Sequence, residues 1–171
     1  MERKRILSII GLSLSEAFRV LDKKLNETQV NTMIRSFKNC YKTFSQDQLI
    51  SPLYEHAKSF LENLKRNKKL ILAIATGKGL EGLLQILEAH NLEKFFSHLQ
   101  TSDYYPSKPD PTMLLSLLET LNISIEDAVM VGDTDFDILM AHQAGIKSIG
   151  VLWGYHSKSR LTLMKPTALA K

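Results

Sequence analysis

The spacing of apolar and polar residues changes at about residue 51. Beyond that point the pattern predicts alternating helices and strands. Residues 70–75 form a continuous apolar run, as expected for a strand covered on both faces. Apolar helical faces are predicted within residues 55–66, 80–90, 110–121 and 135–145, and further strands at 95–101, 128–131 and 146–152. Alternating elements of these lengths predict an α/β fold with a mainly parallel sheet.

Residues 1–50 have a helical pattern throughout. Ser13 and Glu16 have the spacing of a capping box, and Thr28 can cap a second helix with an apolar stripe. Ser51 and Pro52 then break the helical pattern. We therefore predict a small helical cap domain over residues 1–50 and an α/β core domain over residues 51–171.

The composition fits one globular core, since 44% of the 171 residues are hydrophobic and 23% are charged. Cys40 is the single cysteine, so it forms no internal disulfide. The sequence contains neither a signal-peptide pattern nor an apolar run long enough to span a bilayer. These features predict a cytoplasmic protein with no membrane partner.

The formal net charge of +4 comes partly from two basic clusters, at residues 3–5 and 65–69. Neither cluster is interleaved with the aromatic side chains that a base-stacking surface needs. Solvated helix ends are the simpler interpretation, so we predict no nucleic-acid partner.

Three carboxylates, Asp133, Asp135 and Asp137, follow the predicted strand at 128–131 and open a helix. Carboxylates this close repel one another unless a cation lies among them, and Mg²⁺ is a hard cation that prefers oxygen ligands. The alternative is that one aspartate caps the helix and the others favour its positive end. The cluster alone leaves both interpretations open.

Other polar groups follow neighbouring strands of the predicted sheet. Thr76 and Gly77 come directly after the run at 70–75, Lys108 lies in the loop after the next strand, and Asp133 follows the third. Ligands of open α/β sheets bind at the carboxyl ends of the strands. A hydroxyl, an ammonium, a carboxylate and the Gly77 N–H group at one edge predict a site for a phosphoryl group and its metal. Separately, Thr76 could cap a helix and Lys108 could be a surface lysine.

Together these motifs resemble the haloacid dehalogenase superfamily. Residues 72–78, Leu-Ala-Ile-Ala-Thr-Gly-Lys, resemble its second motif, Lys108 before Pro109 its third, and residues 132–137, Gly-Asp-Thr-Asp-Phe-Asp, its fourth. Residues 11–18 and 150–155 further resemble the phosphoglycolate phosphatase branch. The resemblance implies a three-layer, Rossmann-like core with a small helical cap, and a phosphatase of small phosphorylated metabolites.

The resemblance also implies roles for individual residues. Asp133 would be a direct Mg²⁺ ligand, and Asp137 would support the metal or orient Lys108. Thr76 and the Gly77 N–H group would hold phosphate oxygens, and Lys108 would neutralise the charge of the nucleophile and the transferring group. Asp135 has no role in the family pattern and is expected to be an N-cap.

The sequence departs from the family at its start. Family members open with an apolar strand ending in Asp-x-Asp, whose first aspartate is the nucleophile; here Met1 is followed by Glu-Arg-Lys-Arg and then by cap sequence. We therefore expect the first central strand to be missing and the chain to be inactive as it stands. Such a strand is worth about 10 kcal/mol, which is comparable to the stability of a whole domain. Few residues also remain at the end of the chain for the closing strand and helix that family members usually have.

Two other classes of function compete with this interpretation. A catalytically dead remnant could keep a metal or phosphate site as a binding module. A response-regulator receiver shares the α/β plan, but in a receiver the acids precede the threonine and lysine along the chain. The opposite order here argues against a receiver. Within the enzyme class, pyrophosphatase, nucleotidase and sugar phosphatase remain alternatives.

Overall fold

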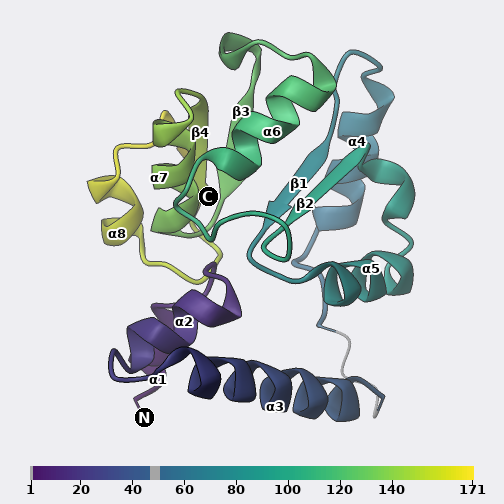
Figure 1. Cartoon of the computed structure of the whole chain (residues 1–171). Coiled ribbons are helices and arrows are strands. Elements are labelled where there is room, and N and C mark those ends of the chain that lie inside the picture. Colours follow the sequence, from purple (N-terminus) through teal and green to yellow (C-terminus); the bar gives the residue numbers. More distant parts are fainter. Residues whose placement is uncertain (1, 47–50) are drawn as a thin grey trace.

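The computed structural model describes residues 2–46 and 51–171. The N-terminal part contains three helices, α1 (Arg3–Leu7), α2 (Leu14–Leu21) and α3 (Glu27–Gln46). Figure 1 shows that these helices lie together at one end of the molecule, with α3 running beneath the remainder of the chain. The predicted domain boundary lies between residues 50 and 51. Residues 47–50 are outside the described part of the chain, so the division into two domains stays a prediction.

The rest of the chain alternates helices and strands, as the hydrophobic pattern predicts. In order, the elements are α4 (Ala57–Arg66), β1 (Ala73–Thr76), α5 (Leu80–Ala89), η1 (Glu93–Phe95), β2 (His98–Thr101), α6 (Thr112–Leu121), η2 (Ile125–Asp127), β3 (Val129–Gly132), α7 (Asp135–Gln143), β4 (Lys147–Val151), α8 (Lys158–Leu163) and β5 (Ala168–Ala170). The prediction of an α/β fold with parallel strands is confirmed, since every strand pair is parallel. No helix in the described ranges has the length and apolar character needed to cross a membrane.

The strands form two separate sheets. One sheet pairs β1 with β2, and the other has the order β3-β4-β5. Within the described residues, no pairing joins β1 to β3, although Figure 1 shows both strands in the same part of the fold with α6 lying over them. The absence of a first central strand stays a prediction.

Two apolar clusters hold the core together. The larger cluster is formed by α6 and α7 with Ile146, and side chains of both sheets pack against it, including Ala73 and Ala75 from β1 and Met130 from β3. The smaller cluster joins α5 to β1 and β2 on their other side, through Leu83, Leu87 and Leu92 with Ile74 and Leu99. Helices therefore cover both faces of the two-stranded sheet.

Several local predictions need correction. The helix that Thr28 was predicted to cap is α3, and it begins at Glu27, so Thr28 lies inside it. The side chains of Asn26 and Gln29 each accept from the other's backbone N–H group at 2.9 Å. The expected shortage of closing elements is also wrong, because α8 and β5 follow β4 and β5 pairs with it. Thr162 to Lys165 continue one more turn before β5, a short connection that hydrophobic periodicity does not reveal.

Candidate functional site

Three loops at the carboxyl ends of the strands meet around Gly11, Leu12 and Ser13, here called the 11–13 loop. A Cβ atom on Gly77, directly after β1, would lie 2.6 Å from the Gly11 carbonyl oxygen and 2.7 Å from that of Leu12. On the other side, a Cβ atom on Gly11 would lie 3.0 Å from Oγ1 of Thr134, which follows β3. The backbone N–H of Ser13 donates to Ser107 Oγ at 2.8 Å in the third loop. The predicted convergence of strand-end loops is therefore observed.

Gly11 needs to be glycine for this arrangement. Its φ angle of 106° lies in the left-handed region, which residues with a Cβ atom rarely adopt. The turn sends the chain from α1 past the strand ends and into α2, whose N-cap Ser13 accepts from the Glu16 N–H. The 11–13 loop thus brings the N-terminal helices into contact with the predicted phosphate-binding residues.

A buried ion pair joins two of the predicted site residues. Lys108 Nζ donates to Asp137 Oδ1 at 2.6 Å, and both side chains are at most 7% exposed. The second oxygen of Asp137 accepts from the Thr134 N–H at 3.0 Å and from its hydroxyl at 2.8 Å. Thr134 in turn accepts from the Asp137 N–H, which completes a capping box at the start of α7. Asp137 is therefore fully engaged in fixing Lys108 and the start of the helix.

Gly132 permits this close approach of α7 to the end of β3. A Cβ atom at Gly132 would lie 2.3 Å from the Cβ atom of Asp137, a distance that real side chains do not tolerate. The glycine of the Gly-Asp-Thr-Asp motif therefore has a packing function in addition to its place in the pattern.

Asp133 is held by the loop that follows β4. Its Oδ2 atom accepts from the Tyr155 N–H at 2.9 Å, and its carbonyl oxygen accepts from the His156 N–H at 3.2 Å. A Cβ atom on Gly154 would lie 2.1 Å from Asp133 Cβ, so only glycine fits there. Burial raises the pKa of the Tyr54 phenol, and the carboxylate of Asp133 and the Tyr155 phenol raise it further. Residues from two distant loops therefore surround this carboxylate.

Asp135 has a different role from the expected one. The N-cap of α7 is Thr134, and Asp135 is the first helical residue. Its carboxylate accepts two hydrogen bonds from Arg160 on α8, at 3.0 and 2.5 Å, and lies 2.9 Å from His156 Nδ1. The expectation that Asp135 caps the helix is wrong, because Thr134 occupies the extended position where its hydroxyl reaches the free N–H group.

Of the two carboxylates predicted to bind or support a metal, Asp137 accepts from Lys108 and Thr134, and Asp133 accepts from the Tyr155 N–H group. No group of three or more His, Cys, Asp or Glu side chains that could hold a metal occurs in the described ranges. Mg²⁺ usually takes one or two protein carboxylates together with waters and phosphate oxygens. Asp133, the less engaged carboxylate, therefore fits Mg²⁺ as a single protein ligand.

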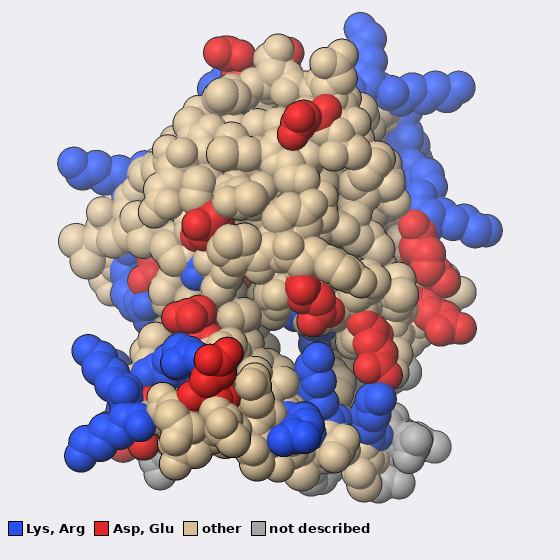
Figure 2. Space-filling model, in the orientation of Figure 1, with Lys and Arg blue, Asp and Glu red and all other residues tan. Residues whose placement is uncertain are grey.

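Several contacts between α3 and the core are electrostatic. Lys42 pairs with Glu81 at 2.9 Å, and Lys38 lies 3.9 Å from Asp103, while the ammonium of Lys78 lies 5.2 Å from the centre of the Tyr41 ring. Figure 2 shows an opening between the N-terminal helices and the rest of the molecule, with acidic side chains on the core side and basic ones on the opposite side. This opening lies on the side of the molecule where the strand-end loops meet the N-terminal part.

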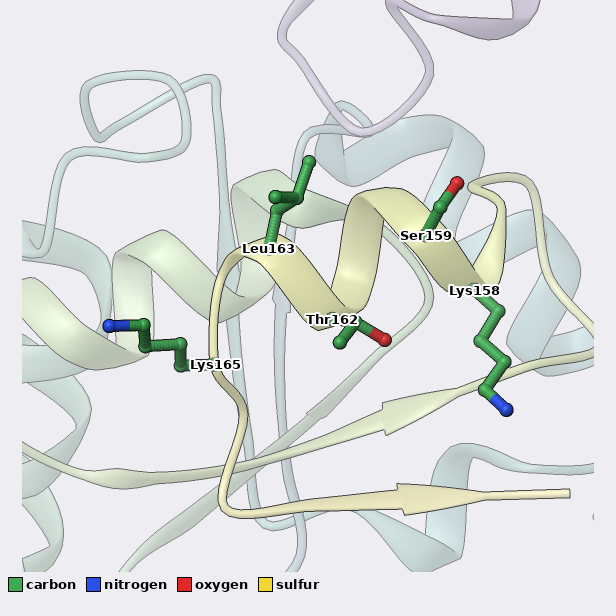
Figure 3. Close-up of a pocket in the computed structure, with 5 residues that line it drawn as sticks. All are labelled: Lys158, Ser159, Thr162, Leu163 and Lys165. Atoms are coloured by element: carbon green, nitrogen blue, oxygen red, sulfur yellow. The ribbon is translucent and has the colours of Figure 1, made fainter.

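A hollow of about 720 Å³ lies beside α8, away from the site residues. It is lined by Lys158, Ser159, Thr162, Leu163 and Lys165. Figure 3 shows that these side chains point to different sides of α8 and do not converge. We assign no binding role to this hollow.

The sequence pointed to Thr76, Gly77, Lys108, Asp133 and Asp137 as candidate site residues but did not reveal what surrounds them. Thr76 Oγ1 accepts from the Lys78 N–H at 3.1 Å, which is the local turn that exposes the strand end. The 11–13 loop, Thr134 and the Asp133 contacts at residues 154–156 arise from tertiary structure. Glycines at 11, 77, 132 and 154 were the available signal, since each permits a close approach that a Cβ atom would prevent.

Comparison with known proteins adds a consistent set of matches. A family model described as haloacid dehalogenase-like hydrolase matches residues 1–151. A phosphoglycolate phosphatase of Pasteurella multocida is 31% identical over 159 residues, covering 92% of this chain and 70% of that protein. Pyrophosphatase PpaX of Bacillus cereus is 31% identical over 166 residues, covering 96% of this chain and 74% of that protein. The solved structure of a hydrolase from Pseudomonas syringae has the same fold, with a TM-score of 0.86 and 23% identity, over all of this chain and 78% of that one.

Proposed function

Because this chain belongs to the haloacid dehalogenase-like hydrolases, we propose that it carries the metal-binding and phosphate-binding part of a Mg²⁺-dependent phosphatase of small phosphorylated metabolites. The observation that carries this proposal is the buried Lys108–Asp137 pair at the point where the three strand-end loops meet. A fixed ammonium at such an edge suits a group that carries several negative charges.

Each site residue has one task in this proposal. The Thr76 hydroxyl and the Gly77 N–H group bind non-bridging phosphate oxygens. Lys108, oriented by Asp137, neutralises negative charge that develops on the transferring group. Asp133 holds Mg²⁺, and the bound metal supplies charge neutralisation and alignment of the phosphate. Asp137 contributes indirectly, because it orients Lys108 and fixes the start of α7.

Within residues 1–171, no candidate nucleophile precedes the cap. Residues 1–13 contain no aspartate, whereas the family resemblance implies an aspartate on a strand that precedes the cap. We propose that residues 1–171 alone bind Mg²⁺ and phosphate but do not turn over substrate. A binding module without activity is the competing function, and it predicts no turnover even after a nucleophile has been supplied.

The substrate class rests on the names of relatives. One relative is named a phosphoglycolate phosphatase and another a pyrophosphatase, so we propose a small phosphate ester or diphosphate as substrate. We also propose a cytoplasmic setting, which the free thiol of Cys40 favours.

The test uses an extended chain in which an apolar strand ending in Asp-x-Asp is joined ahead of Met1 by a flexible linker. With Mg²⁺, this protein should hydrolyse phosphoglycolate or pyrophosphate, and the preferred one distinguishes the two substrate classes. Asp133→Asn should lower kcat/KM by roughly 100-fold or more, and Thr76→Val by about tenfold to 100-fold, because each removes a group that stabilises charge in the transition state. Asp127→Asn, the same change at an exposed aspartate in η2, should leave activity unchanged. An Asp133→Asn protein as active as the Asp127→Asn control would refute the assignment of the metal site.

A further inference from the structure

An ion pair between α7 and α8 lies outside the set of residues that the proposed function uses. Arg160 of α8 donates two hydrogen bonds to Asp135 Oδ2, from Nε at 3.0 Å and from a terminal nitrogen at 2.5 Å. Hydrogen bonds between two charged groups are stronger than neutral ones, and the planar guanidinium fixes their direction. Figure 1 shows α8 beside α7, and this pair therefore ties the two helices together.

His156 attaches the segment between β4 and α8, here called the 152–157 loop, to the same start of α7. Its Nδ1 atom accepts from the Asp135 N–H at 3.1 Å, and the centre of its ring lies 5.7 Å from that of Phe136. The residue is only 2% exposed, so its ring is fixed by packing. The loop is thus held by β4 at one end and by Asp135, through His156 and Arg160, at the other.

The 152–157 loop in turn holds Asp133. The Tyr155 N–H donates to Asp133 Oδ2 at 2.9 Å, and the His156 N–H donates to the Asp133 carbonyl oxygen at 3.2 Å. The loop backbone lies directly against this side chain, since a Cβ atom on Gly154 would be 2.1 Å from Asp133 Cβ. Among the described residues, no hydrogen bond reaches Oδ1 of Asp133. The loop therefore fixes one carboxylate oxygen and leaves the other to a metal.

A Mg²⁺ ligand depends on such support. Mg²⁺ requires near-ideal octahedral geometry with short bonds to oxygen, so a small displacement of the carboxylate weakens binding. Groups that orient a metal ligand without touching the metal commonly contribute tenfold to 100-fold in metal affinity. Any residue that sets the position of the Tyr155 N–H group is therefore expected to influence the affinity for Mg²⁺.

We infer that Arg160 and Asp135 are positioning residues for Asp133, acting through the 152–157 loop on the carboxylate that would bind Mg²⁺. The inference rests on the metal-binding role proposed for Asp133. Charge and position give opposite expectations for Arg160. Removal of a positive charge would by itself favour a nearby cation, whereas loss of the support from the loop would weaken its binding.

The test titrates residues 1–171 with Mg²⁺ and follows the amide signals of Asp133 and Tyr155 by NMR. We expect Arg160→Met to raise the Kd for Mg²⁺ about tenfold, and to change the Tyr155 N–H signal before any metal is added. Arg160→Lys keeps the positive charge and can donate to Asp135, so its Kd should lie between those of the other two proteins. The lysine variant also supplies the test if the methionine variant does not fold.

Two controls separate positioning from a general loss of structure. Inorganic phosphate, titrated without Mg²⁺, should bind the original chain and Arg160→Met equally, because its proposed ligands Thr76 and Lys108 follow other strands. Arg66→Met, the same change at an exposed arginine in α4, should leave the Kd for Mg²⁺ unchanged.

Unchanged or tighter Mg²⁺ binding by Arg160→Met would overturn the inference and leave the metal site at Asp133 intact. Equal weakening of Mg²⁺ and phosphate binding would also overturn it, since that result assigns Arg160 a purely structural role. If the original chain binds no Mg²⁺, or Asp133→Asn binds it equally well, the metal site itself is refuted and the inference with it.

Discussion

The ion pair between Lys108 and Asp137 is the most consequential contact between single side chains. Both groups are buried, and Asp137 also accepts two hydrogen bonds from Thr134. We expect Lys108→Met to lower the free energy of unfolding by about 3–5 kcal/mol, because it leaves a buried carboxylate without its cation. Urea unfolding of the two proteins measures the difference.

A second variant separates charge from packing at this pair. In Lys108→Met with Asp137→Asn, no charge is buried and the amide oxygen can still accept from Thr134. Much of the lost stability should therefore return. If the single Lys108→Met variant loses less than about 1 kcal/mol, the pair is not buried as described.

His156 should give the chain a distinct pH dependence. Burial lowers the pKa of His156 below its ordinary value of 6.5; Arg160 lowers it further, and Asp135 acts in the opposite direction. As pH falls below about 6.5, the unfolded chain takes up a proton before the folded chain does, so stability decreases and keeps decreasing until the folded pKa is passed. The contribution of His156 is fully present above that range.

The measurement is the free energy of unfolding at pH 7.5 and at several values down to pH 5, compared with that of His156→Gln. As the pH falls, the free energy of unfolding of the original protein should decrease more than that of the variant. A constant difference across this range would show that His156 does not titrate as described.

At the residue scale, the sequence predicted candidates but not their partners. Lys108, Asp133 and Asp137 stand out because they follow successive predicted strands, whose carboxyl ends are where ligands of open α/β sheets bind. The hydrogen bond from Lys108 to Asp137 was one of the alternatives that the motif allowed, and the structure has it. The contact of Asp133 with the Tyr155 N–H depends on how a loop 22 residues away folds back, and no local pattern reports that.

The 11–13 loop is the element whose position most affects the site. Gly77→Ala should displace it, since the new Cβ atom would lie within 2.7 Å of two backbone carbonyl oxygens that no side-chain rotation can move. We expect a loss of roughly 1–3 kcal/mol in the free energy of unfolding, and altered NMR shifts at Gly11 and Ser13.

Gly82→Ala in α5 provides the matched control for this prediction. Its Cβ atom would meet only the flexible side chain of Lys78, at 3.6 Å. Because alanine favours a helix more than glycine does, this variant should gain about 0.5–1 kcal/mol. Equal behaviour of the two alanine variants would contradict the close approach at Gly77.

At the element scale, periodicity predicted the helices and strands better than their ends. The apolar run at 70–75 begins before β1, because residues 70–72 precede the paired part of the strand. Thr134 caps α7 although Asp135 was expected to do so. The N-cap is the residue with an extended backbone ahead of the helix, and composition does not reveal which residue that is. The six-residue helix α8 and the three-residue strand β5 are too short for a recognisable period.

The described residues contain two separate parallel sheets, and the candidate site lies at the carboxyl ends of strands from both. Thr76 ends β1, Lys108 lies in the loop after β2 and Asp133 follows β3, so the candidate residues come from both sheets. The alternating hydrophobic pattern predicted the parallel strands, and the positions of Thr76, Lys108 and Asp133 after successive strands predicted a site at that edge. Sequence periodicity alone could not predict the break between the sheets, because pairing between strands is a property of the folded chain.

We propose that Thr76, Lys108 and Asp133 form the phosphate-binding and metal-binding part of a phosphatase centre whose nucleophile is a carboxylate on a further strand. Three proteins test it most directly: residues 1–171, the extended chain with an Asp-x-Asp strand, and the same extended chain with the first aspartate changed to asparagine. With Mg²⁺ and a small phosphate ester, we predict release of inorganic phosphate by the second protein alone. Equal turnover by residues 1–171, or by the asparagine variant, would contradict the account.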